Sequence, residues 1–288
     1  MLRATTSWFL LITAFFIVLI SACITDCVIK LLHYLRFKSA SRVFFVKFSQ
    51  FTELLLKFWG TRIEIDTSAM NIDQRRPVLF VSSHHSSMDV TLLGNHLSRC
   101  IKYRKLSFVC RGGLDRWLPA FSFYTRQYCY SLTRRGAKSA LGSSPFALDE
   151  PGLAEFATRI DSDGDALVIF PEGVKPINDA EGCRSFRRKG LRILLENMPN
   201  AQIVPIGIAG TGSFYTTPRS FKDVTNNWPR FNRRLQVQLL PVLHDFQLTS
   251  IEDTIDILEA QIFASYEKLR NPKATACQLN GLNQKWIQ

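Results

Sequence analysis

The sequence lacks the patterns that identify several common protein classes. Its seven cysteines are odd in number, and no closely spaced pair lies outside the apolar N-terminus, which argues against a disulfide framework and for a reducing compartment. A Gly-x-Ser-x-Gly nucleophile elbow is absent, which disfavours a serine hydrolase. The turn Gly210–Ser213 lacks the rest of a glycine-rich phosphate loop. No nucleic-acid fold motif, internal repeat or low-complexity tract is present, so nucleic acid is not an expected partner.

Acidic side chains are in the minority. The 288-residue chain has 36 lysines and arginines against 24 aspartates and glutamates, which gives a formal net charge of +12. A positive balance of this size attracts acidic partners, such as anionic lipid surfaces or phosphate-bearing substrates. With 46% apolar and 21% charged residues the composition is globular, and the length suits one good-sized domain once an N-terminal segment is set aside.

Charged residues are also absent from Ser7 to Thr25. The length of this apolar run matches the roughly 20 residues that cross a bilayer core, so it predicts an N-terminal membrane helix. Two other interpretations stay open: a cleaved signal peptide, because Ser21–Cys23 weakly resembles a cleavage site, and a buried helix of a soluble core. More lysines and arginines follow the run than precede it, which predicts that the rest of the chain lies on the cytoplasmic side of a membrane.

Phenylalanines and leucines recur at roughly helical spacing between Phe44 and Phe58, with Lys47, Gln50 and Lys57 between them. This pattern predicts an amphipathic helix that lies at a membrane interface or packs on the main domain. The chain is therefore expected to consist of an N-terminal membrane anchor with an amphipathic helix, residues 1–60, and a main domain, residues 61–288.

The main domain alternates short β-rich runs with helical patterns. The predicted strands are Arg62–Asp66, Pro77–Ser82, Leu106–Cys110, Ala166–Phe170, Ile203–Ile208 and Leu235–Leu240. The predicted helices are Val90–Leu97, Leu153–Ile160, Gly190–Glu196 and Ile251–Leu269, and Gly136–Gly152 predicts a loop. Strands that alternate with helices predict an α/β domain with a central sheet flanked by helices.

Two side chains with complementary chemistry follow the apolar strand Pro77–Ser82. If a helix begins near Ser86, the carboxylate of Asp89 can fold back onto the imidazole of His84. Such an imidazole can remove a proton from an attacking alcohol, while the carboxylate fixes its tautomer and stabilises the imidazolium. A metal site of His84, His85 and Asp89 is the alternative interpretation, but no further ligand is near in sequence, so no metal is expected.

The segment His84–Asp89 resembles the HxxxxD box of the glycerolipid acyltransferases, a family that includes the PlsC-like 1-acyl-glycerol-3-phosphate acyltransferases. The fuller pattern of that box is NHxSxxD; Ser86 stands at its serine position, and Ser83 replaces its asparagine. Phe170–Gly173 matches the family's FPEG box, and Ile203–Ile208 resembles its fourth box, a strand with a proline. The boxes occur in the family's order.

The resemblance implies an α/β fold with a central mixed sheet and a role for each matched residue. His84 and Asp89 would be catalytic, and the acceptor would be bound by Ser86, Arg134, Glu172, Gly173 and Lys175. Arg134 is preferred over Arg135 as the phosphate ligand, because the alternation of the preceding residues leads to it. The family's Thr-Arg-Ser after FPEG is replaced here, so Lys175 would act as a point charge rather than a bidentate fork.

These matches imply an acyltransferase that moves a fatty acyl chain from an acyl thioester to lysophosphatidic acid and gives phosphatidic acid. No cofactor is expected beyond the thioester, and acyl-CoA and acyl carrier protein remain alternative donors. Acylation of another lysophospholipid and a non-catalytic membrane lipid-binding protein are the alternatives, and the oligomeric state stays open. Two basic clusters would either attract phosphates or form a solvated face: Arg99, Lys102, Arg104, Lys105 and Arg111, and Arg184, Arg187, Arg188, Lys189 and Arg192.

Overall fold

The computed structural model describes part of the 288-residue chain. The described residues are 40–58, 60–86, 88–102, 104–111, 129–134, 146–173, 182–212, 234–243 and 250–271. The chain divides into two compact units, one formed by Met1–Phe48 with Cys110–Ala147 and the other by Ser49–Val109 with Leu148–Gln288. The predicted membrane helix, Ser7–Thr25, lies outside the described residues.

A mixed β-sheet forms the centre of the larger unit. Its strands follow the order β1-β8-β7-β2-β6-β3. All neighbours in this order are parallel except β7 and β8, which are antiparallel. The bounds are β1 (Arg62–Asp66), β2 (Val78–Ser82), β3 (Leu106–Arg111), β6 (Ala166–Ile169), β7 (Gln202–Ala209) and β8 (Arg234–Leu239). Each of the six predicted strands is confirmed.

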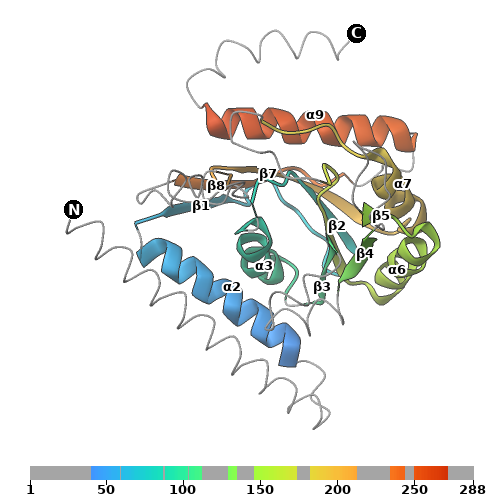
Figure 1. Cartoon of the computed structure of the whole chain (residues 1–288), viewed down its shortest axis with the longest axis horizontal. Helices are drawn as coiled ribbons and strands as arrows, with labels where there is room; N and C mark the ends of the chain where they lie inside the picture. Colours follow the sequence, from blue (N-terminus) through green and yellow to red (C-terminus); the bar gives the residue numbers. More distant parts are fainter. Residues whose placement is uncertain are drawn as a thin grey trace. The chain divides into compact units, whose positions relative to one another are not determined.

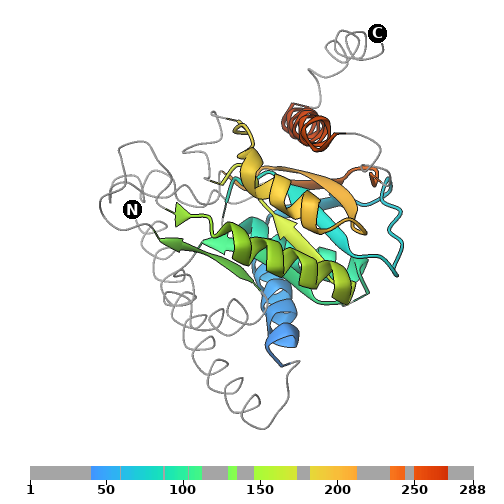
Figure 2. The same cartoon turned by 90° about the vertical axis from the view of Figure 1, so that its right-hand side faces the viewer.

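Helices flank this sheet on both faces (Figure 1). They are α3 (Met88–Cys100), α6 (Glu150–Asp163), α7 (Arg188–Asn197) and α9 (Ile251–Arg270), and each contains a predicted helix. Figure 1 shows α9 on one side of β7 and α3 on the other, while α6 and α7 run side by side in Figure 2. The predicted α/β class and the sheet flanked by helices are therefore confirmed.

The predicted loop Gly136–Gly152 is partly wrong. Phe146–Ala147 forms strand β5, which pairs antiparallel with β4 (Tyr130–Arg134) in the smaller unit. Helix α6 begins at Glu150, because the side chain of Asp149 accepts a hydrogen bond from Gly152 N and Pro151 occupies the first helical turn. The glycine and proline that indicated a loop, Gly152 and Pro151, therefore belong to the first turn of a helix.

The central strands read as continuous apolar runs because both faces of the sheet are covered. Val78–Val81 of β2 are fully buried, and all residues of β7 are buried as well.

Gly207 of β7 allows α9 to approach closely, since a Cβ at this position would lie 2.1 Å from Ser265 Oγ. The carboxyl ends of the parallel strands β2 and β6 lie side by side, which brings the segments that follow them together.

The predicted amphipathic helix is α2 (Ala40–Phe58). In the larger unit it packs through Leu56 against Leu235, and Glu53 accepts a hydrogen bond from Asn95 and pairs with His96 Nε2 at 2.9 Å. Large apolar side chains remain exposed on it, with Leu54 64% and Phe58 83% exposed. Within the described residues, no helix combines the length and apolarity needed to cross a membrane.

Candidate active site

The loop between β2 and α3 brings His84 and Asp89 into contact. The distance from His84 Nδ1 to Asp89 Oδ2 is 2.9 Å. The backbone N–H groups of His85 and Ser86 also donate to Asp89 Oδ2, each at 2.8 Å. Helix α3 starts at Met88, so Asp89 lies in its first turn, and its side chain folds back over the loop as the spacing predicts. The predicted contact between imidazole and carboxylate is confirmed.

Asp89 is fully buried yet remains ionised. Burial alone raises the pKa of Asp89, but the hydrogen bond and charge of His84, the hydroxyl of Thr211 and the backbone N–H of Ser86 lower the pKa below its usual value. An ionised carboxylate at Nδ1 requires a proton on that nitrogen. The lone pair of the neutral ring therefore lies on Nε2, and the His84 side chain is 16% exposed. The pair is arranged to accept a proton from a ligand.

Glu172 fixes the backbone of this loop from the neighbouring strand end. Its Oε1 accepts a hydrogen bond from His84 N at 3.1 Å, and its Oε2 accepts one from Arg184 N at 3.1 Å. Burial, which leaves the side chain 2% exposed, raises the pKa of Glu172 to about 7. Phe170, two residues earlier, stacks on the His84 ring with centroids 4.3 Å apart. The FPEG turn thus holds His84 by its backbone and by its ring.

Gly173 ends this turn in the left-handed region, with φ of 68°. A Cβ at Gly173 would lie 2.8 Å from Arg187 Cδ, so the side chain of Arg187 passes directly over the turn. The backbone anchors it there, because Arg187 N donates to Pro171 O at 2.8 Å. The sequence predicts Arg187 only as one member of a basic cluster, and nothing in its local pattern distinguishes it from its neighbours.

The structure separates the members of that cluster. Three cations that follow Arg187 form surface ion pairs with the neighbouring helices: Arg188 with Glu252 and Asp256, Lys189 with Glu150, and Arg192 with Glu252. No carboxylate of the described residues forms an ion pair with Arg187. The Arg187 side chain is exposed beside the FPEG turn, where an anionic ligand can meet it.

The other basic cluster contains structural groups. Arg104 donates to Arg76 O and Gly164 O at 2.7 and 2.6 Å, and Lys105 pairs with Asp165 at 2.9 Å. These residues precede β3 and β6, whereas His84 and Glu172 follow β2 and β6. Because the strands are parallel, Arg104 and Lys105 lie at the opposite edge of the sheet from the His84–Asp89 pair.

The remaining predicted site residues differ in what the structure shows of them. Ser86 is buried, and its hydroxyl accepts a hydrogen bond from Met88 N at 3.2 Å, a contact that supports the start of α3. Arg134 is the last residue of β4, in the smaller unit, and its side chain lies outside the described part of the structure. Lys175 and Arg135 lie outside the described residues.

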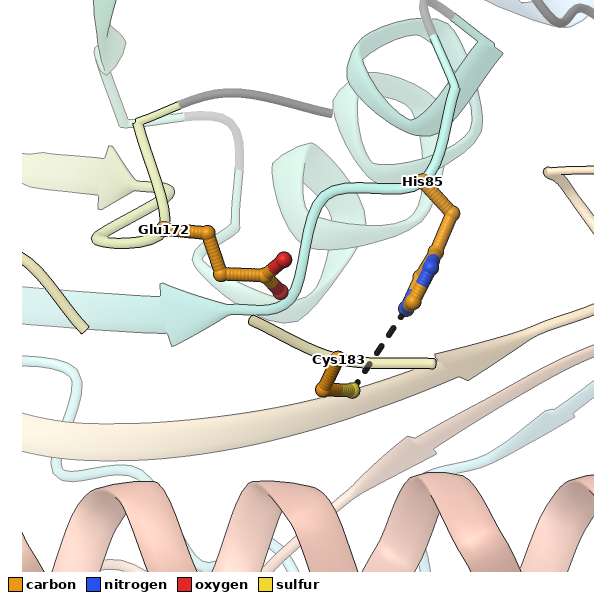
Figure 3. Close-up of side chains that lie close together, drawn as sticks. All are labelled: His85, Glu172 and Cys183. Atoms are coloured by element: carbon orange, nitrogen blue, oxygen red, sulfur yellow. Dashed lines mark hydrogen bonds between the residues drawn. The ribbon is translucent and has the colours of Figure 1, made fainter. Parts of the chain in front are cut away.

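His85 contacts Asp89 through its backbone N–H, whereas its ring nitrogen lies near Glu172 and Cys183. The imidazole stacks on Tyr266 of α9 with centroids 4.5 Å apart and an interplanar angle of 12°. Its Nε2 lies 3.7 Å from Cys183 Sγ. Figure 3 marks this contact with a dashed line. The alternative metal site of His84, His85 and Asp89 is therefore wrong, because the two neighbouring imidazoles bind different partners.

Comparisons with known proteins agree with this geometry. The sequence model of the family described as Acyltransferase matches residues 64–209 of the chain. The fold is similar to the "Crystal Structure of the 1-acyl-sn-glycerophosphate (LPA) acyltransferase, PlsC, from Thermotoga maritima", with a TM-score of 0.63 and 16% identity over 93% of this chain and 95% of that one. No curated protein matches the sequence. At this identity the structural similarity shows the fold alone, whereas the family match covers the segments from β1 to β7.

Proposed function

Because the chain belongs to the acyltransferase family, we propose that it transfers a fatty acyl chain from an acyl thioester to lysophosphatidic acid and produces phosphatidic acid. The observation that supports this most directly is the 2.9 Å contact between His84 Nδ1 and buried Asp89, which makes His84 Nε2 the proton acceptor. The similar Thermotoga maritima protein is a lysophosphatidic acid acyltransferase, which supports the choice of acceptor.

The proposed reaction uses the acceptor hydroxyl as nucleophile. His84 Nε2 removes the hydroxyl proton while the oxygen attacks the thioester carbonyl, and ionised Asp89 stabilises the resulting imidazolium. Collapse of the tetrahedral intermediate breaks the carbon–sulfur bond and restores the carbonyl. The departing thiolate takes the proton from the imidazolium, which returns His84 to its neutral form. No covalent acyl-enzyme is required.

Positive charge beside the FPEG turn supports a phosphate-bearing acceptor. Arg187 passes over Gly173, and Glu172 in the same turn directs its carboxylate oxygens to backbone N–H groups instead of to solvent. A guanidinium in this place can form a bidentate contact with a phosphate. We assign the acceptor phosphate to Arg187, with Arg134 and Lys175 as the further candidates that the family resemblance implies.

We also propose that the protein acts at a membrane, with its catalytic unit on the cytoplasmic side. The uncharged run Ser7–Thr25 and the net charge of +12 support this. So does α2, whose exposed Phe51, Leu54 and Phe58 offer an apolar face. Protease protection of the N-terminal and C-terminal ends in sealed vesicles tests the orientation, and release of the full chain by salt alone would contradict the membrane anchor.

The function is tested with the detergent-purified full chain, acyl-CoA and lysophosphatidic acid. Turnover is expected to fall about a thousandfold in His84→Ala, in line with the loss of a general base. His96→Gln is the matched control, because His96 lies on α3 and pairs with Glu53 away from the loop. Equal turnover of wild type and His84→Ala would refute the mechanism.

A panel of acceptors and donors tests the substrate assignment. Lysophosphatidic acid is compared with lysophosphatidylcholine and lysophosphatidylethanolamine, each with acyl-CoA and with acyl-acyl carrier protein. The assignment requires the highest kcat/KM with lysophosphatidic acid. A preference for a substituted head group would replace it with phospholipid remodelling, and binding of lipids without any transfer would replace it with a non-catalytic role.

A further inference from the structure

Three potential metal ligands from separate segments meet beside the candidate active site. His85 comes from the loop after β2, Glu172 from the turn after β6, and Cys183 from the segment before α7 (Figure 3). One imidazole nitrogen, one carboxylate oxygen and the sulfur all lie within 4.8 Å of one another. None of the three is the general base or its partner carboxylate.

The spacing of two of these atoms suits a tetrahedral ion. Zinc lies about 2.0–2.1 Å from a histidine nitrogen and about 2.3 Å from a cysteine sulfur, so a tetrahedral angle separates the two ligand atoms by about 3.6 Å. His85 Nε2 and Cys183 Sγ are 3.7 Å apart. The two ligands therefore already stand at the separation that a bound ion requires.

The surroundings hold the ligands in place. His85 and Glu172 are each 2% exposed, and the stacking of His85 on Tyr266 fixes the plane of its ring. The fully buried hydroxyl of Ser83 lies beside the Cys183 thiol and has no other hydrogen-bond partner among the described residues. This hydroxyl, or a water, is available as the fourth ligand.

The local charge favours a cation. The carboxylates of Glu172 and Glu267 both act electrostatically on the Cys183 thiol. Negative charge at this place attracts a divalent ion, and the ion compensates the thiolate on binding.

We propose that His85 Nε2, Cys183 Sγ and a Glu172 carboxylate oxygen bind one divalent transition-metal ion of the zinc class. The mixed nitrogen, sulfur and oxygen donors select such an ion over magnesium or calcium, which take oxygen ligands. The bound ion joins three segments that are separate in sequence, so it stabilises the loop that contains His84. Binding releases the thiol proton to solvent.

The test uses the full chain, stripped of metal by a chelator and titrated with cobalt(II) as a spectroscopic substitute for zinc. We expect one equivalent to give the visible bands of tetrahedral cobalt and a near-ultraviolet charge-transfer band from thiolate to cobalt. In Cys183→Ser the charge-transfer band should disappear and the dissociation constant should rise at least about tenfold. Cys100→Ser, a partly buried cysteine on α3, is the matched control and should keep both.

Zinc binding is also followed by thermal unfolding. Zinc should raise the melting temperature of the wild type and of Cys100→Ser, and at the same zinc concentration should raise that of Cys183→Ser less. Absence of the charge-transfer band in the wild type, or its persistence in Cys183→Ser, would overturn the proposal and assign the 3.7 Å contact to a thiol–imidazole hydrogen bond. Neither readout needs a substrate, so the result is independent of the proposed acyl transfer.

Discussion

Charged side chains lie at both ends of the parallel strands of the central sheet. We call the end where these strands begin the amino edge and the end where they finish the carboxyl edge, and the charged groups at the two edges have different partners. At the amino edge, Arg104 donates to three backbone carbonyls and Lys105 pairs with Asp165. At the carboxyl edge, Asp89 is held by loop donors, while His84 Nε2 and Arg187 keep capacity for a ligand. The comparison shows what distinguishes a candidate active site from a structural charge cluster. In the structural cluster the charged groups bond to other parts of the protein, whereas in the candidate site some of them can still bind a ligand.

The largest contrast is expected between Asp89→Asn and Asp165→Asn. Each change removes a buried carboxylate that pairs with a cation or imidazole, one at each edge. Asp89→Asn should lower kcat about 10³–10⁴-fold, because the amide cannot hold His84 in the required tautomer. Asp165→Asn should lower the melting temperature and leave kcat of the folded enzyme unchanged. Comparable kcat losses in both variants would remove the distinction between the edges.

A smaller effect is expected from Glu172→Gln. Each carboxylate oxygen of Glu172 accepts one backbone hydrogen bond, but a glutamine has only one acceptor oxygen. One of the two hydrogen bonds is therefore lost, and the loop and the His84 ring should shift. We expect kcat to fall about 10–100-fold with KM for lysophosphatidic acid nearly unchanged, since the loss is one of positioning. Glu259→Gln is the control, because Glu259 accepts from Phe186 N at 3.1 Å and pairs with Arg188 at 4.0 Å, and neither contact involves His84. A rise in KM at constant kcat would instead assign Glu172 to acceptor binding.

Arg187→Ala sharpens the comparison within the basic cluster. Loss of a charged contact to the acceptor phosphate should raise KM for lysophosphatidic acid about tenfold and change kcat little. Arg192→Ala is the matched control, since Arg192 lies further along α7 and pairs with Glu252. An equal rise in KM for lysophosphatidic acid in the two variants would indicate a general effect of surface charge.

The smallest expected effect on the reaction comes from Arg104→Met at the amino edge. Three backbone carbonyls lose a donor, which should lower the free energy of unfolding by about 1–3 kcal/mol. Turnover per folded molecule should stay at the wild-type level. Arg99→Met, on the exposed last turn of α3, controls for loss of charge, and denaturant unfolding measures all three proteins. A lower kcat in Arg104→Met would show that the amino edge also affects the chemistry.

The sequence predicts the sheet well because its signals are local. β2 and β7 are buried on both faces and therefore read as unbroken apolar runs. The contact between His84 and Asp89 is also local, because a short loop and the first helical turn determine it. The start of α6 is missed because Gly152 and Pro151 belong to a helix start as readily as to a loop. β5 is missed because its two residues, Phe146 and Ala147, are too few to show an alternating pattern.

The parts of the site that the sequence does not reveal depend on distant residues. Glu172 contacts His84 across 88 positions of the chain. Arg187 resembles Arg188 and Arg192 in sequence, and only the acidic side chains of α6 and α9 separate them in the folded protein. The cluster of His85, Glu172 and Cys183 likewise needs three separate segments to be assembled first.

The last described helix has a consequence for how the protein is made. Tyr266 of α9 supports the His85 ring, and Ser265 fills the space above Gly207. His84 and Asp89 are synthesised long before this helix. A nascent or prematurely terminated chain that lacks α9 therefore has the His84–Asp89 pair without these contacts.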